Sequence, residues 1–128
     1  MYNTYPILCY GGYKMDAELF TNRYPEGTTF NILGTEYILK YNSKRCQLND
    51  AVGLCETYSK IIYLDLSASD SIHSVENLYL FFVKVLRHEL MHAFFYEMGL
   101  ECYCQDEVLV DALAIKSNQI MNVLSSVK

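Results

Sequence analysis

The sequence lacks tryptophan and contains only two prolines and three histidines in 128 residues. It has no apolar run near the roughly 20 residues that a membrane-spanning helix requires, so we expect no membrane partner. Positive charge is also scarce, because ten lysines and arginines stand against fifteen aspartates and glutamates, a formal net charge of −5. A nucleic-acid-binding surface normally carries a basic stripe, so we expect no nucleic-acid partner.

The five cysteines form no paired framework, and the N-terminal residues lack the basic region and apolar core of a secretory signal. We therefore expect reduced thiols and a cytoplasmic protein, because disulfides persist mainly in oxidising compartments. Hydrophobic residues make up 52% of the chain and charged residues 20%. This composition and length predict one globular domain over residues 1–128 that buries a core without disulfides.

The pattern predicts an α+β fold, a small antiparallel sheet followed by a long helix and a C-terminal helix. Residues 1–25 show little pattern apart from a short helical stretch at 15–20. Two strand pairs are predicted, at 29–33 with 36–41 around a Gly34-Thr35 turn, and at 53–58 with 60–65. The polar residues 42–50 between them are predicted to form a loop.

Apolar residues at three- and four-residue steps predict a long helix from Ser74, a typical N-cap residue, to Met98. Gly99 then stands where glycine often ends a helix. A short loop at 101–105 precedes a final helix at about 106–124, which we expect to fold back on the long helix. Its predicted apolar stripe comprises Val108, Leu109, Ala112, Leu113, Ile115 and Ile120.

Two of the three histidines lie in the long helix, in the sequence His88-Glu89-Leu90-Met91-His92. Helix residues four apart share a face, so both imidazoles can reach one zinc ion with bonds of about 2.1 Å. Glu89 lies about 100° around the helix, where its carboxylate can act as the general base on a zinc-activated water. The motif predicts a metal site with a catalytic carboxylate.

The alternative is an ordinary helix that carries two histidines by chance. With so few histidines in the chain, this spacing is improbable by chance. The surrounding residues are also apolar, and a buried cluster of His88, Glu89 and His92 without a metal would leave polar groups unsatisfied. We therefore favour the metal site.

A catalytic zinc site needs a third protein ligand and an open position for water. Phe95 and Met98 stand where the longer HExxHxxGxxH pattern needs glycine and histidine, so that class is excluded. Glu97 follows His92 by five residues and is turned well around the helix, so it is a poor candidate for the third ligand. The remaining donors are Glu101, Cys102, Cys104, Asp106, Glu107, Asp111 and, farther away, His73.

We favour Glu107 as the third ligand, because it lies in the first turn of a helix that must return to the first one. Asp111 follows on the same face and can accept a hydrogen bond from the second N–H of a ligating histidine. Two alternatives stay open. Glu107 and Asp111 can belong to a solvated acidic face, and Cys102 with Cys104 can complete a closed structural zinc site without a catalytic position.

The stretches HELMHAFFYEMGL and DEVLVDALA resemble the small gluzincin-type zinc metallopeptidases of phages and mobile elements, related to the ImmA/IrrE group. The resemblance is strongest over residues 83–115, includes GLCETYSKIIYLDLS more weakly, and does not reach the first 25 residues. It implies a minimal zincin-like fold, with His88, His92 and Glu107 as zinc ligands, Glu89 as general base and Asp111 as a supporting residue.

The resemblance further implies cleavage of a protein or peptide, with a transcriptional repressor as the substrate of the ImmA-like relatives. The loop between the two helices is shorter than in larger gluzincins. No residue for stabilising the oxyanion stands out among Tyr58, Tyr63, Tyr96 and Tyr103. The rival function is a zinc-stabilised binding or regulatory module without catalysis.

Overall fold

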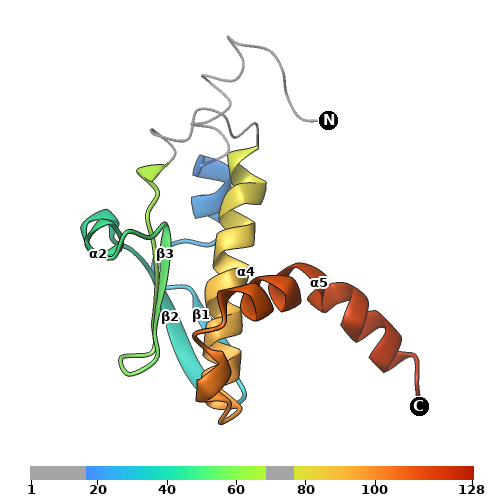
Figure 1. Cartoon of the computed structure of the whole chain (residues 1–128). Coiled ribbons are helices and arrows are strands. Elements are labelled where there is room, and N and C mark those ends of the chain that lie inside the picture. The colour runs from blue at the N-terminus through green and yellow to red at the C-terminus, as the bar shows by residue number, and fades with distance from the viewer. Residues whose placement is uncertain (1–16, 69–76) are drawn as a thin grey trace.

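A computed structural model describes residues 17–68 and 77–128 (Figure 1). It confirms the α+β class, with the sheet first and the two long helices after it. Residues 17–23 are helical, which overlaps the stretch predicted at 15–20. The elements in chain order are β1 (Thr29–Ile32), β2 (Thr35–Tyr41), α2 (Ser43–Leu48), β3 (Gly53–Glu56), β4 (Ile61–Leu64), α4 (Leu78–Glu97), the 3-10 turn η1 (Glu101–Tyr103) and α5 (Glu107–Ser125).

The first two strands form a hairpin with a two-residue turn at Leu33 and Gly34, one residue earlier than predicted. Both residues have positive φ, 53° and 95°, as the favoured hairpin turns require. The Asn31 side chain accepts a hydrogen bond from the Gly34 N–H at 2.7 Å. Glycine tolerates this conformation without a steric cost, so it fixes the second turn position.

The four strands form one mixed sheet in the order β1-β2-β4-β3. The pairs β1–β2 and β3–β4 are antiparallel as predicted, but β2 and β4 are parallel, so the prediction of a fully antiparallel sheet was wrong. After α2 the chain forms β3 at the far edge of the sheet and then returns as β4, which lies between β2 and β3. Strand β3 is therefore an edge strand. That edge faces the candidate site.

The connection after β2 is a short helix and not the predicted loop. Asn42 caps α2 by accepting a hydrogen bond from the Arg45 N–H at 3.0 Å, and Cys46 is the one fully buried residue of the helix. Six residues with a single buried position give too little apolar periodicity to be recognised in the sequence.

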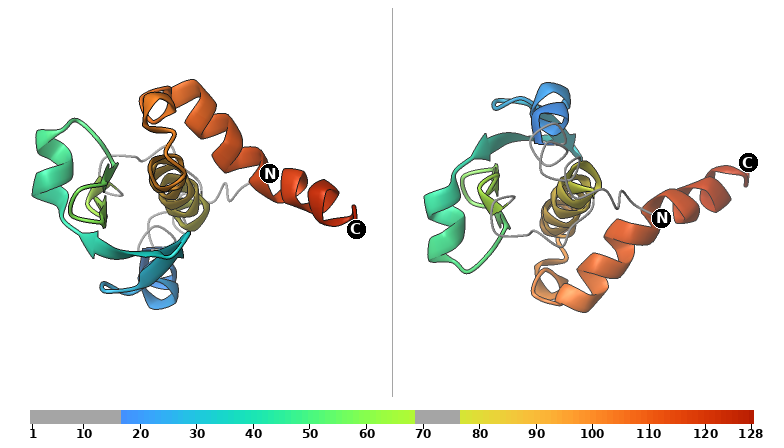
Figure 2. Two further views of the ribbon diagram at one scale, coloured as in Figure 1. Left: turned by 90° about the horizontal axis from the view of Figure 1, so that it is seen from below. Right: turned by 90° about the horizontal axis from the view of Figure 1, so that it is seen from above.

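The long helix α4 begins at Leu78, with Asn77 as its N-cap. Ser74, the predicted cap, lies outside the described residues. The helix ends at Glu97 and Gly99 has a φ of 77°, which confirms the predicted glycine stop. The core lies between α4, the sheet and the helical residues 17–23 (Figure 2). Its buried residues are Phe20, Ile32, Tyr37, Leu39, Ile62, Leu64, Leu78, Phe82, Leu86 and Ala93.

The final helix α5 returns to α4 as predicted, but only its first half packs there. Val110 and Ala114 are its buried residues, whereas Val108, Ile115 and Ile120 of the predicted stripe are exposed. The predicted stripe was therefore wrong in part, although its Leu109 and Leu113 do pack against the buried cluster of Phe95, Cys104 and Val110. Beyond it, α5 extends away from the body (Figures 1 and 2). In the described part of the chain, no helix is long and apolar enough to cross a membrane.

Candidate metal centre

The two histidines of α4 and the first-turn glutamate of α5 converge on one point. The Nε2 atoms of His88 and His92 are 3.3 Å apart. The Glu107 carboxylate places Oε2 2.9 Å from His88 Nε2 and Oε1 3.0 Å from His92 Nε2. Asp106 caps α5 by accepting from the Leu109 N–H at 3.0 Å, which starts the helix at Glu107. The structure thus brings together the three residues predicted as ligands.

This cluster fits a zinc ion in its dimensions and in its donor atoms. Four ligands at about 2.1 Å in a tetrahedron lie about 3.4 Å from one another, close to the separations of His88, His92 and Glu107. Within the described chain, these three residues form the group whose ligand atoms all lie within 4.8 Å of one another. Two imidazoles and one carboxylate are a donor set of catalytic zinc sites.

Asp111 lies one turn after Glu107, with Oδ1 3.2 Å from Nδ1 of His88. If Nδ1–H donates to this carboxylate, Nε2 of a neutral His88 carries only a lone pair. That lone pair faces a carboxylate oxygen and the second imidazole, an arrangement that is repulsive unless a proton or a cation lies between them. The contact predicted between Asp111 and a histidine is therefore present, and the arrangement calls for either a proton or a cation among these atoms.

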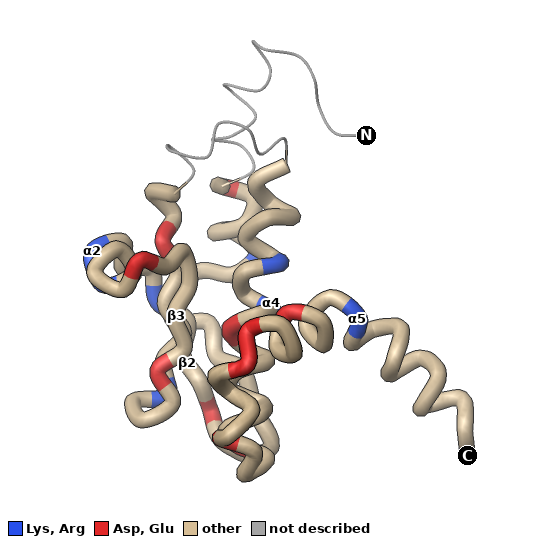
Figure 3. Tube along the Cα trace, viewed as in Figure 1, with Lys and Arg blue, Asp and Glu red and all other residues tan. Residues whose placement is uncertain are grey.

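The surroundings of the two histidines shift their pKa values in opposite directions. Burial lowers the pKa of His88, but hydrogen bonds with Glu107 and Asp111 outweigh it and hold that pKa above its usual value. For His92, burial dominates and lowers the pKa. Acidic residues gather around the junction of α4 and α5 (Figure 3), which favours a cation there.

Glu89 points from α4 toward β3 and is only 8% exposed. Burial raises the pKa of Glu89 to about 7, with a smaller lowering by His88 and a smaller raising by Glu107. A cation at the neighbouring cluster would lower this pKa by attraction. The carboxylate is therefore close to the candidate ligands without being one of the converging three.

Gly53, the first residue of β3, makes room for this carboxylate. A Cβ atom at position 53 would lie 2.6 Å from Cγ1 of Val85 and 3.0 Å from Cγ of Glu89. Gly53 was not among the residues predicted for the site. An isolated glycine at the start of a predicted strand often marks a close approach of the backbone, and that signal could have identified it.

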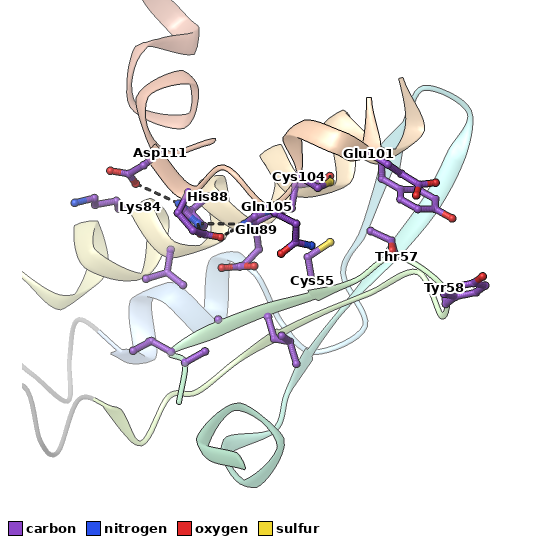
Figure 4. Close-up of a pocket in the computed structure, with 18 of the residues that line it drawn as sticks. Cys55, Thr57, Tyr58, Lys84, His88, Glu89, Glu101, Cys104, Gln105 and Asp111 are labelled. Atoms are coloured by element: carbon purple, nitrogen blue, oxygen red, sulfur yellow. Dashed lines mark hydrogen bonds and ion pairs between the residues drawn. The ribbon is translucent and has the colours of Figure 1, made fainter. Parts of the chain in front are cut away.

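The cluster lies in a cleft of about 730 Å³. The edge strand β3 forms one wall, α4 the floor, and the segment from η1 into α5 the other wall. Figure 4 shows Lys84 and Asp111 toward one end of the cleft and Thr57, Tyr58 and Glu101 toward the other. Apolar side chains of Val52, Phe81 and Val85 also line it. The size and mixed lining are those of a ligand-binding cleft.

The cysteines that were the rival ligands lie outside the converging group. Cys102 is exposed, and Cys104 is buried with Sγ donating to the backbone carbonyl of His92 at 3.2 Å. Burial raises the pKa of Cys104, which disfavours the thiolate that zinc needs. The geometry therefore favours Glu107 over a closed site with cysteine ligands.

The other donors considered have different roles or positions. Glu97 accepts hydrogen bonds from Tyr37 Oη and Lys60 Nζ, each at 2.7 Å, and so joins α4 to the sheet. Asp106 is the N-cap of α5 and Glu101 lines the cleft. His73 lies outside the described residues.

Among the tyrosines considered for the oxyanion, Tyr58 and Tyr96 line the cleft. Tyr58 is 95% exposed, and the Lys60 ammonium lies 4.6 Å from the ring centroid of Tyr96. Tyr63 is buried in β4, and Tyr103 lies beside Phe95. Within the described residues, none of the four tyrosines hydrogen-bonds to His88, His92 or Glu107, so the oxyanion role is assigned to none of them.

Comparisons of the chain with protein-family models, with curated proteins and with solved structures found no match. The family resemblance therefore stays a prediction, and the case for a function rests on the geometry of the site.

Proposed function

We propose that this protein is a zinc-dependent metallopeptidase. The observation that carries the proposal is the convergence of His88, His92 and Glu107 in a cleft, with the buried carboxylate of Glu89 beside them. Converging donors alone support metal binding. The adjacent carboxylate and the cleft add the features that hydrolysis of a bound peptide requires.

Each residue has a defined role in this proposal. His88, His92 and Glu107 would hold zinc, which supplies Lewis-acid polarisation of a carbonyl group and a lower pKa for a water molecule. Glu89 accepts the proton of the attacking water and passes it to the leaving amine. Asp111 holds the ring of His88 in orientation by accepting its Nδ1–H.

The substrate is proposed to be an extended peptide segment that lies along β3. An edge strand has backbone N–H and C=O groups on its outer side that can pair with another strand. Gly53, Leu54 and Cys55 of β3 line the same cleft as the metal-binding group, so a peptide paired there would pass over Glu89. The family resemblance makes a repressor protein the first substrate to test.

We further propose that the protein acts in the cytoplasm. Its four described cysteines are all unpaired, and unpaired thiols are typical of reducing compartments.

The substitution Glu89→Gln tests the catalytic role. It preserves the size of the side chain and removes the base, so zinc content should be unchanged while the rate of peptide cleavage falls by about 10²–10⁴-fold. Glu101→Gln is the matched control, because it changes a carboxylate in the same cleft that lies outside the converging group, and it should retain activity.

Unchanged cleavage by the Glu89→Gln variant would overturn the proposed mechanism. A wild-type protein that binds one zinc ion and cleaves no member of a peptide library would instead support the binding module without catalysis.

A further inference from the structure

Lys84 of α4 is the one lysine or arginine among the described residues that line the cleft (Figure 4). Its side chain is exposed, and it takes part in none of the ion pairs of the described chain. Asp111 lies toward the same end of the cleft, but its carboxylate contacts Nδ1 of His88 at 3.2 Å. Within the described part of the chain, the Lys84 ammonium group is therefore available to a bound molecule.

Lys84 lies one helical turn before the metal-binding group on the floor of the cleft. Lys84, His88 and His92 follow one another at four-residue steps, so their side chains project from one side of α4. A four-residue step rises about 6 Å along the helix axis. An extended peptide rises about 3.3 Å per residue, so a peptide that runs along α4 past the metal-binding group would reach Lys84 about two residues from the reacting bond.

The edge strand β3 gives the direction of such a peptide. Gly53 at its start lies beside Val85, the residue after Lys84, whereas Lys60, just past its other end, pairs with Glu97 at 2.7 Å. Strand β3 therefore runs away from Lys84, in the same direction as α4. Antiparallel strand pairs are the more common and the slightly more stable kind. A peptide paired antiparallel with β3 runs toward Lys84.

We propose that Lys84 determines specificity by binding a substrate carboxylate about two residues C-terminal to the cleaved bond. The inference rests on the proposed function, in which a peptide lies along β3. A lysine ammonium is a compact charge with three donors, which suits a carboxylate of any orientation. That carboxylate belongs either to an Asp or Glu side chain or to the C-terminus of the peptide, and the two sources are distinguished below.

Peptides blocked at both ends test the side-chain source. Each carries one glutamate at a different position of an otherwise uncharged sequence, and a matched set carries glutamine instead. At the second residue after the cleaved bond, glutamate should raise kcat/KM over glutamine by about 3–5-fold, the size of a solvent-exposed ion pair. About 0.5 M sodium chloride should reduce this preference by screening. Lys84→Gln should remove it, and Lys84→Glu should favour lysine at the same position.

Peptides that end at the second residue after the cleaved bond test the C-terminal source. Amidation of that end should lower kcat/KM by about 3–5-fold in wild type and leave Lys84→Gln unchanged. A Lys84-dependent preference in either set supports the proposal and identifies the carboxylate. Lys116→Gln is the matched control, because it removes an exposed lysine of α5 outside the cleft and should behave as wild type. Zinc content should be equal in all variants.

The outcomes separate this inference from the peptidase activity. Cleavage with no carboxylate preference in either set, or with a preference that persists in Lys84→Gln, overturns the role of Lys84 and leaves the peptidase proposal standing. If no peptide is cleaved, the peptidase proposal fails, and fluorescence anisotropy of the same peptides with zinc-loaded protein tests the subsite. Tighter, Lys84-dependent binding of the carboxylate peptides then supports it, whereas equal or absent binding overturns it.

Discussion

Gly53 of β3 lies so close to Glu89 of α4 that a Cβ atom on Gly53 would stand 3.1 Å from the Oε2 atom of that carboxylate. The same Cβ atom would lie 2.6 Å from Cγ1 of Val85. The absence of a side chain at one strand position thus allows the candidate general base to lie between α4 and the edge strand.

The substitution Gly53→Ala should destabilise the protein by about 1–3 kcal/mol, because the added methyl overpacks a contact that includes the stiff side chain of Val85. It should also lower the cleavage rate by displacing Glu89, with zinc affinity retained. Urea unfolding and a peptide-cleavage assay measure the two effects.

The double variant Gly53→Ala/Val85→Ala is the control for this prediction. It removes the nearest clashing atom, so its stability loss should be smaller than the sum of the two single losses. Additive losses would show that the Gly53 contact with Val85 is not the source of the strain.

Asp111→Asn should weaken zinc binding by about 10–100-fold while leaving the fold intact, because the role proposed for Asp111 is to orient His88 and strengthen it as a ligand. Competition with a chromophoric chelator measures the zinc affinity. Glu101→Gln removes an equal charge from the same cleft without a histidine contact. An equal loss in both variants would show a general charge effect and contradict the specific role of Asp111.

Asp65 should contribute stability that is lost in acid. Burial opposes its charge, but hydrogen bonds from Ser43, Ser67 and Gln47 outweigh this and hold the pKa of Asp65 below its ordinary value of 3.8. Its contribution is therefore complete above the unfolded value, near pH 4, and is lost as pH falls through the lower folded value.

The substitution Asp65→Asn should cost about 1–3 kcal/mol at neutral pH and make the acid decline of stability shallower. Urea unfolding at pH 7 and pH 3 measures both effects. The exposed Asp50→Asn is the control, with little change expected at either pH. An acid decline in Asp65→Asn as steep as in wild type would contradict the prediction.

The parts of the fold that the sequence predicted correctly depend on local pattern. The long periodic run that forms α4 and the glycine at position 99 are signals within a single element. The parallel pairing of β2 with β4 is different, because it depends on where α2 and β3 place the chain. Short strands carry no information about which neighbour they pair with.

The site was predictable for the same reason, and its surroundings were not. The spacing of His88 and His92 fixes a shared helix face, and Glu107 follows from the need for the next helix to return. The approach of Gly53 to Glu89 joins two elements whose relative position no local pattern determines. The apolar residues of α5 misled the prediction of its stripe, because α4 covers only one side of the first half of that helix and leaves Val108, Ile115 and Ile120 exposed.

X-ray absorption spectroscopy of the zinc-loaded protein tests the metal centre most directly. The proposed function predicts one zinc ion with two imidazole nitrogens and oxygen ligands at about 2.0–2.2 Å, and no sulfur. Loss of one imidazole from the spectrum of a His92→Ala variant would confirm the assignment. A sulfur shell at about 2.3 Å would place Cys102 or Cys104 on the metal and contradict the open, catalytic zinc site proposed for this protein.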